Sequence, residues 1–182
     1  MLCALAKFTR KKFDEVREQA TRVGQIIHVD LIESISPETN HTKKKYVLIV
    51  IDDFLRYLQT FVMKTKSETY EMMNEALRSI QARFPGPGQF KKVRCDKGGE
   101  FEAKEFQNVL EKYGASPQYS EANVHEHNGT AERLIKTLDD CLRSLLLESG
   151  FHANMWGQLV DMATWIYNRT AHSSEYRLHH SI

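Results

Sequence analysis

The sequence "YVLIVIDDF", residues 46–54, is an almost unbroken run of aliphatic and β-branched side chains. A run of this length without polar alternation is typical of a strand that is buried on both faces. "RYLQTFVMK", residues 56–64, follows after a tight connection and predicts an antiparallel partner strand. The two runs predict a hairpin at the centre of a sheet, with Asp52 and Asp53 serving its turn.

The remaining pattern, read outward from this hairpin, alternates strands with helices. Short apolar runs bounded by turn residues predict strands, and apolar residues at helical spacing predict helices. Pro and Gly clusters and Gly150 separate these segments. The order βββαβαβαα predicts one α/β domain. We expect strands at 25–33, 90–95 and 115–120, a polar loop at 34–45, and helices at 67–84, 103–114, 129–149 and 153–170.

Two of the helices show a clear apolar face. In residues 67–84 this face comprises Tyr70, Met73, Leu77 and Ile80, and Ser67 with Glu68 forms a plausible cap. The last helix carries its face on Trp156, Leu159, Val160, Ala163 and Ile166, and both Trp156 and Trp165 are expected in the core rather than as base-stacking groups.

Composition sets wide limits on the function. The chain has 182 residues, 41% hydrophobic and 27% charged, with a net charge of +1, which is ordinary for one globular domain. Cys3, Cys95 and Cys141 are too few and too far apart for a disulfide framework, so a reducing compartment is expected. The apolar runs fall short of the ~18 residues that a membrane helix needs, so no membrane partner is expected.

Three acidic residues occupy positions where an open α/β sheet presents groups to a ligand. Asp30 lies near the end of the strand at 25–33, and alternation turns it away from Val29 and Leu31. Asp96 follows the strand at 90–95, and the glycines after it allow a sharp turn that leaves the carboxylate uncovered. Glu132 falls in the first turn of the helix at 129–149. Strand ends and helix starts meet at one edge of such a sheet.

Three carboxylates in one cleft repel each other unless a cation lies between them. Hard oxygen ligands suit Mg²⁺ or Mn²⁺, and two such ions can bind both the attacking and the leaving oxygen of a phosphodiester. The pattern therefore predicts a two-metal site for phosphoryl transfer.

Each of these residues also has a simpler interpretation. Asp30 alone is typical of a surface acid, Asp96 of a turn, and Glu132 of a helix N-terminus, where the macrodipole favours negative charge. His125 and His127 lack a third partner at ligand spacing and are interpreted as a solvated loop. The run Lys43–Lys45 is interpreted in the same way, with a DNA phosphate contact as the alternative.

The combination of motifs resembles a known family. "HVDL" (28–31), "RCDKGGEF" (94–101) and "NGTAERL" (128–134) resemble the D,D(35)E triad of retroviral and retrotransposon integrases. The 35 residues from 97 to 131 between the second and third acids match its interval. Two longer stretches are similar to the copia type of long-terminal-repeat retrotransposon, namely "YVLIVIDDFLRYLQTFVMKTKSE" (46–68) and "MWGQLVDMATWIYNRT" (155–170).

This resemblance implies a fold and an activity. The fold would be ribonuclease-H-like, α/β, with a mixed five-stranded sheet flanked by helices. The activity would be DNA strand transfer, in which a 3′-hydroxyl of the element's DNA attacks a phosphodiester of target DNA. Asp30, Asp96 and Glu132 would hold two Mg²⁺ or Mn²⁺ ions. DNA contacts would come from Lys97, Asn128, Arg133 and Lys136.

The resemblance also implies how the chain is organised and where it acts. Residues 22–182 would be the catalytic core, and residues 1–21 resemble the tail of the zinc module that precedes it. Cys3 would stand for the last ligand of that module, but its histidines and first cysteine are absent, so no zinc is expected. Homo-oligomers are expected, with a nuclear location and a cytoplasmic particle stage.

Two departures from the family keep a second function open. Lys97 stands where the family usually has asparagine, and "EANVHEHNGTAE" (121–132) lacks the usual proline before the third acid. The alternative is a captured or decaying copy that keeps the fold for nucleic-acid or protein binding without catalysis. A ribonuclease H proper is a third possibility, which the 35-residue interval and the "NGTAER" helix start disfavour.

Overall fold

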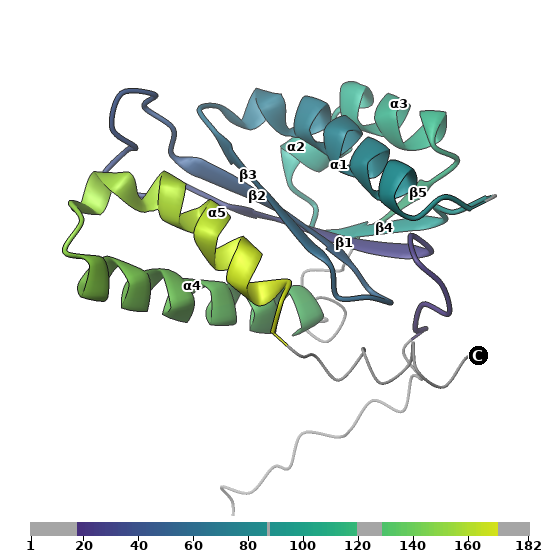
Figure 1. Ribbon diagram of the computed structural model, residues 1–182. Helices are drawn as coiled ribbons and strands as arrows, with labels where there is room; N and C mark the ends of the chain where they lie inside the picture. Colours follow the sequence, from purple (N-terminus) through teal and green to yellow (C-terminus); the bar gives the residue numbers. More distant parts are fainter. Residues whose placement is uncertain (1–17, 87, 120–128, 171–182) are drawn as a thin grey trace, which may run out of the picture.

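The computed structural model describes residues 18–86, 88–119 and 129–170, the last range without the side chains of residues 129–133. A five-stranded sheet in the order β3-β2-β1-β4-β5 forms the centre of the domain (Figure 1). Its strands are β1 (Ile26–Ile32), β2 (Tyr46–Asp52), β3 (Leu58–Met63), β4 (Lys92–Cys95) and β5 (Ser116–Tyr119).

Five α-helices and two short 3₁₀ turns in the described ranges complete the domain. The helices are α1 (Thr69–Arg83), α2 (Gly99–Glu102), α3 (Lys104–Lys112), α4 (Gly129–Ser149) and α5 (Trp156–Tyr167), and the turns are η1 (Lys66–Glu68) and η2 (Ala153–Met155).

The sheet is mixed, as predicted. β1 pairs antiparallel with β2 and parallel with β4, while β2 and β3 form the predicted antiparallel hairpin. β5 extends the parallel half beside β4. From Val47 onward every residue of β2 is buried, which explains its unbroken apolar sequence.

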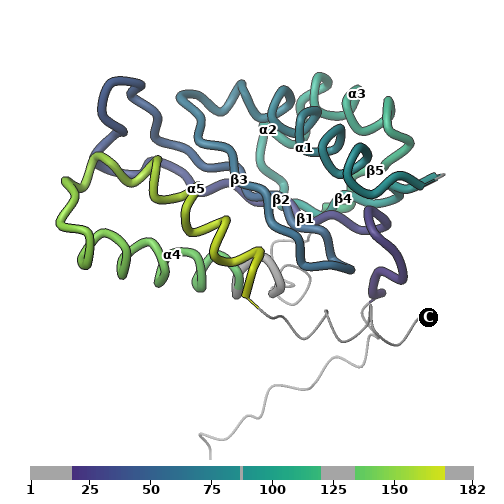
Figure 2. The backbone as a smooth tube through the Cα atoms, viewed as in Figure 1, coloured from purple at the N-terminus to yellow at the C-terminus, as the bar shows by residue number. Residues whose placement is uncertain are grey.

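Helices cover both faces of the sheet. α1, α2 and α3 pack on one face, whereas α4 and α5 lie side by side on the other (Figures 1 and 2). Alternation along β1 and β2 divides the core accordingly. Val29 and Val50 face α1, and Val47 and Ile49 face α4 and α5. Side chains on β1 with even numbers therefore point toward the α4–α5 side.

Four details differ from the sequence prediction. Tyr70 is 36% exposed, with its hydroxyl donating to the Glu71 carboxylate at the surface, and Ala76 joins the buried face of α1. The cap of η1 comes from Thr65, whose N–H donates to the Glu68 carboxylate, so Ser67 is not the capping residue. The turn α2 was not expected.

Trp165 is the fourth difference. The prediction that both tryptophans lie in the core is right for Trp156, which is 4% exposed, and wrong for Trp165, which is 56% exposed. The Arg169 guanidinium lies 3.9 Å from the centre of the Trp165 ring. Trp165 lies outside the buried face of α5, which is formed by Trp156, Leu159, Val160 and Ala163, and a cation–π contact replaces core packing.

Two expectations from composition concern cysteines and membranes. Cys95 is buried and Cys141 is half-buried, and neither forms a disulfide within the described residues. Within residues 18–86, 88–119 and 129–170, no helix has both the length and the apolar character to span a bilayer.

Candidate active site

Asp30 and Asp96 are brought together by the register of two parallel strands. β1 and β4 pair Ile26 with Lys92 and His28 with Arg94. Continuing the same register by two residues places Asp30 beside Asp96, which directly follows β4. In a parallel ladder, partners in register project to the same face. Two predicted site residues therefore lie next to each other at the carboxyl ends of adjacent strands.

Both acids face the side of the sheet that α4 covers. Val29 and Cys95, their immediate neighbours, belong to the core under α1. Alternation therefore turns Asp30 and Asp96 to the opposite face, where Leu134 of α4 is buried against the sheet. Asp30 is half-buried and Asp96 is exposed. The prediction that Asp30 points away from its apolar neighbours is confirmed.

Negative charge gathers at the end of β4. Burial, followed by the charges of Asp96, Asp30, Glu100 and Glu102 in that order, raises the pKa of the Cys95 thiol to about 12. The Leu31 N–H donates to Asp30 at 2.8 Å, and the Gly98 N–H donates to Asp96 at 3.3 Å. A site of this potential favours a cation.

Lys66 links the segments that follow the two acids. Its ammonium contacts the carboxylate of Glu33, three residues after Asp30, and lies 3.8 Å from Glu100, four residues after Asp96. Glu33 and Lys66 are 33 positions apart, and their pairing has no signal in the sequence. This lysine is a neighbour of the candidate site that sequence reasoning missed.

The other predicted site residues are described only in part. Glu132 and Arg133 fall in the first turn of α4, as predicted, but their side chains lie outside the described residues, as do Asn128 and the two histidines His125 and His127. Among the described side chains, no three acidic, imidazole or thiol groups gather closely enough to hold a metal ion. Asp30 and Asp96 are two members of the predicted triad, and the third stays a prediction.

The predicted DNA contacts Lys97 and Lys136 are both exposed. Lys97 directly follows Asp96. Lys136 lies two positions from Leu134 and from Leu138, both of which are buried against the sheet. Two positions correspond to about 200° around a helix, so Lys136 is on the solvent side of α4.

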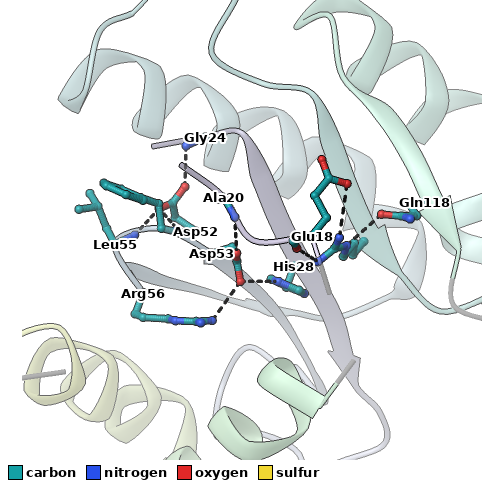
Figure 3. Close-up of polar contacts among 11 residues, drawn as sticks. Glu18, Ala20, Gly24, His28, Asp52, Asp53, Leu55, Arg56 and Gln118 are labelled. Carbon is teal, nitrogen blue, oxygen red and sulfur yellow. Dashed lines mark hydrogen bonds and ion pairs between the residues drawn. The ribbon is translucent and has the colours of Figure 1, made fainter. Parts of the chain in front are cut away.

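A second acidic pair, Asp52 and Asp53, serves the β2–β3 turn and more. The Asp52 carboxylate accepts N–H groups from Phe54 (3.1 Å) and Leu55 (2.7 Å) in the turn, and from Gly24 (2.6 Å) (Figure 3). Burial raises the pKa of Asp52, and these bonds oppose the rise. The predicted role in the turn is confirmed, and the bond to Gly24 also ties residues before β1 to the hairpin.

Asp53 gathers partners from three segments. It accepts the Ala20 N–H at 2.9 Å, lies 3.0 Å from His28 Nε2, and pairs with Arg56 at 3.2 Å (Figure 3). Burial raises the pKa of Asp53, but the bonds from His28 and Ala20 and the charges of His28 and Arg56 outweigh it. The pKa is therefore held well below its ordinary range.

The residues before β1 are also held by Arg94. This buried guanidinium donates to Gln118 at 2.9 Å and to the backbone oxygen of Glu18 at 3.2 Å (Figure 3). Residues from Glu18 onward thus contact the core. The predicted division of the chain at residue 22 stays a prediction.

Comparison with known proteins identifies the family. Residues 20–124 match the family described as "Integrase core domain", and the chain belongs to this family. The predicted ribonuclease-H-like fold and the resemblance to integrase cores of copia-type retrotransposons are confirmed by this match, by the relatives and by a solved structure.

The relatives are retrotransposon polyproteins. The "Retrovirus-related Pol polyprotein from transposon TNT 1-94" of Nicotiana tabacum is 26% identical over 92% of this chain, which spans 12% of that protein. The polyprotein from transposon RE1 of Arabidopsis thaliana is 27% identical over 92% of this chain and 11% of its own length. This chain therefore spans only about one eighth of the length of these relatives.

A solved structure shares the fold. A chain of the simian T-cell lymphotropic virus intasome, in complex with PP2A regulatory subunit B56 gamma, matches with a TM-score of 0.66 and 17% identity. The match covers 91% of this chain and 57% of that chain.

Proposed function

We propose that this domain catalyses metal-dependent DNA strand transfer, the insertion of element DNA into target DNA. The β1–β4 pairing carries the proposal, since continuing its register by two residues brings Asp30 and Asp96 together on the face that α4 covers. Glu132 lies in the first turn of the same helix, α4. The family and the retrotransposon relatives support the same activity.

The donors of this site fit Mg²⁺ or Mn²⁺. Asp30 and Asp96 offer hard carboxylate oxygens in a region whose negative charge already raises the pKa of Cys95. With Glu132 as third ligand, the site would hold two ions, which when bound supply positive charge at the attacking and leaving oxygens of a phosphodiester. The protein's own task is to fix these carboxylates and to position the DNA.

Positioning of DNA is assigned to residues around the acids. Lys97 and Lys136 are exposed cations beside Asp96 and in the second turn of α4, where they reach phosphates as point charges. Asn128 and Arg133 are proposed as further contacts. Assembly into homo-oligomers, with action in the nucleus after a cytoplasmic particle stage, completes the proposal.

The proposal is tested with a labelled DNA end and a supercoiled target in Mg²⁺ or Mn²⁺. Wild type is expected to join the two, and Asp30→Asn and Asp96→Asn to lose joining. Asp140→Asn, an exposed acid on α4, is the matched control and should keep activity. Joining by Asp30→Asn at the wild-type rate would contradict the site assignment.

Metal binding gives a second readout that does not need turnover. Titration calorimetry should show weak Mn²⁺ binding by the protein alone and tighter binding with a DNA end, because phosphate oxygens complete the coordination shell. Asp30→Asn should abolish the difference. Equal binding by wild type and Asp30→Asn would overturn the proposed ligands.

One observation favours a second candidate function, a nucleic-acid-binding or protein-interaction domain without catalysis. Lys97 is exposed and directly follows Asp96 in the chain, so its ammonium would compete with a metal for that carboxylate. If Lys97→Asn gains strand transfer that wild type lacks, the chain has kept the fold and lost the activity through this substitution.

A further inference from the structure

The outer edge of β3 carries hydrogen-bonding groups that no strand covers. The backbone N–H of Asp52 donates to the backbone oxygen of Tyr57 at 3.0 Å, so the backbone oxygen of Tyr57 points toward β2. In an antiparallel pair the direction alternates along the strand. The N–H and C=O of Leu58 and of Thr60 therefore point away from β2, to the outside of the sheet.

Asn168 already uses one of these positions. The Leu58 N–H donates to Asn168 Oδ1 at 2.8 Å, and Asn168 Nδ2 donates to the Leu58 oxygen at 2.8 Å. The side-chain amide thus makes the two bonds that a peptide group of a neighbouring strand would make. Two residues further on, the N–H and C=O of Thr60 point the same way, and among the described residues none hydrogen-bonds them.

An open groove of about 580 Å³ lies along this edge. Its floor is β3, and its walls come from the end of α1 on one side of the sheet and from α5 on the other. Edge strands of this kind are templates for an additional strand, and proteins normally protect them. Here the Asn168 side chain protects the backbone groups of Leu58 but does not reach those of Thr60.

The groove has positive charge on both walls. Arg83 lies over the Tyr57 ring at 5.1 Å on the α1 side, and Arg169 stacks on Trp165 on the α5 side. Neither arginine forms an ion pair with an acid of the described residues. Asp161 is the acidic residue of the groove, so two cations face one anion.

We propose that this groove binds an extended acidic peptide, which adds to the edge of β3 as a sixth strand. The peptide's N–H and C=O pair with those of Thr60. Because successive side chains of a strand point to opposite faces, two adjacent acidic residues reach Arg83 on one side and Arg169 on the other. The proposal does not depend on catalysis at Asp30 and Asp96.

The chemistry of the edge favours a peptide over its rivals. The N–H and oxygen of Thr60 need an acceptor and a donor side by side, which the backbone of an extended peptide supplies and a phosphodiester group, with acceptors alone, does not. A second copy of the chain, joined edge to edge at Thr60, would bring four arginines together against two aspartates. An acidic peptide satisfies both the backbone groups and the two guanidiniums.

The first test uses two labelled eight-residue peptides of equal composition in fluorescence anisotropy. Both consist of threonine and valine with two central glutamates, which are adjacent in one peptide and separated by one residue in the other. The adjacent arrangement should bind more tightly, by about threefold or more, since it alone satisfies both arginines. Equal binding would overturn the strand geometry.

Backbone pairing is tested without changing the protein. N-methylation removes a donor from the peptide, and methylation at the one residue whose N–H pairs with the Thr60 oxygen should weaken binding about tenfold, whereas methylation at the neighbouring residues should have little effect. A uniform response along the peptide would show that it does not add as a strand, and would overturn the proposal.

Protein variants test the charged walls. Arg83→Glu and Arg169→Glu should each weaken binding of the adjacent-glutamate peptide by about five- to tenfold. Arg78→Glu, an exposed charge reversal on the same helix as Arg83 but outside the groove, should leave binding unchanged. Equal losses in all three variants would show a general charge effect and refute a specific groove.

The rival occupants are outcomes of the same experiment. A single-stranded oligonucleotide that displaces the peptide and loses affinity in Arg83→Glu and Arg169→Glu would make the groove a nucleic-acid site and overturn the proposal. A wild-type dimer in sedimentation that becomes monomeric in Arg169→Glu would make it an interface between copies, with the same consequence.

Discussion

The two acidic pairs of this domain, Asp52–Asp53 and Asp30–Asp96, have the same chemistry and opposite surroundings. Asp52 and Asp53 are 1% and 5% exposed, and their partners include backbone and side-chain groups from residues 20–28, far from them in sequence. The hydrogen bonds given above for Asp30 and Asp96 come from one and two residues away, and Asp96 is exposed.

This difference separates structural carboxylates from candidate ligands. A buried carboxylate is tolerated when donors and cations satisfy it, and it then holds segments together. Carboxylates that lie side by side in negative surroundings attract a cation. The comparison predicts that the first pair matters for folding and the second for binding.

The largest effect is expected at Asp53. Asp53→Ala leaves buried His28 and half-buried Arg56 without their common partner, and should lower the free energy of unfolding by about 3–5 kcal/mol. Urea denaturation measures it, with Asp140→Ala, an exposed acid on α4, as control. A loss no larger than that of the control would remove the distinction between the pairs.

The contribution of Asp53 to the free energy of unfolding should also depend on pH. Because the pKa of Asp53 is lowered by folding from its ordinary 3.8, its stabilisation is fully present above that value and is lost as pH falls below it. The difference in unfolding free energy between wild type and Asp53→Asn should therefore shrink as pH is lowered from 5 to 2. A difference that stays constant over this range would contradict the charged pairing.

A smaller effect, on DNA binding rather than on stability, is expected at Lys136. It tests whether DNA lies near Asp30 and Asp96. Lys136→Glu should weaken binding of DNA ends and reduce the salt dependence by about one phosphate contact. Its exposed position predicts an unchanged melting temperature. An unchanged salt slope with a lower melting temperature would instead make it a helix-pairing residue, with Glu132 as partner.

The smallest effect is expected at Asp96. In chelator, Asp96→Asn should change the free energy of unfolding by less than about 0.5 kcal/mol, and any change should be stabilising because repulsion from Asp30 is relieved. Thermal denaturation beside wild type decides it. A loss of several degrees would show that Asp96 is structural, like Asp53.

The sequence by itself predicted the five strands and the longer helices, and it supplied the candidate site residues. The apolar run of β2 required burial on both faces, and alternation along β1 turned Asp30 from the core, because period and burial are local properties of a strand. The motifs around Asp30, Asp96 and Glu132, taken together with the interval between the last two and with the longer copia-like stretches, indicated the family that the match over residues 20–124 confirms.

Tertiary structure alone decided which residues meet. Asn168 hydrogen-bonds the backbone of Leu58, which lies 110 positions away in the chain. Lys66 pairs with Glu33, and Asp53 pairs with His28. Burial of Trp156 and exposure of Trp165 likewise depend on which side of α5 contacts β3. These pairings arise from how helices dock on a twisted sheet, a long-range choice that spacing along the chain does not encode.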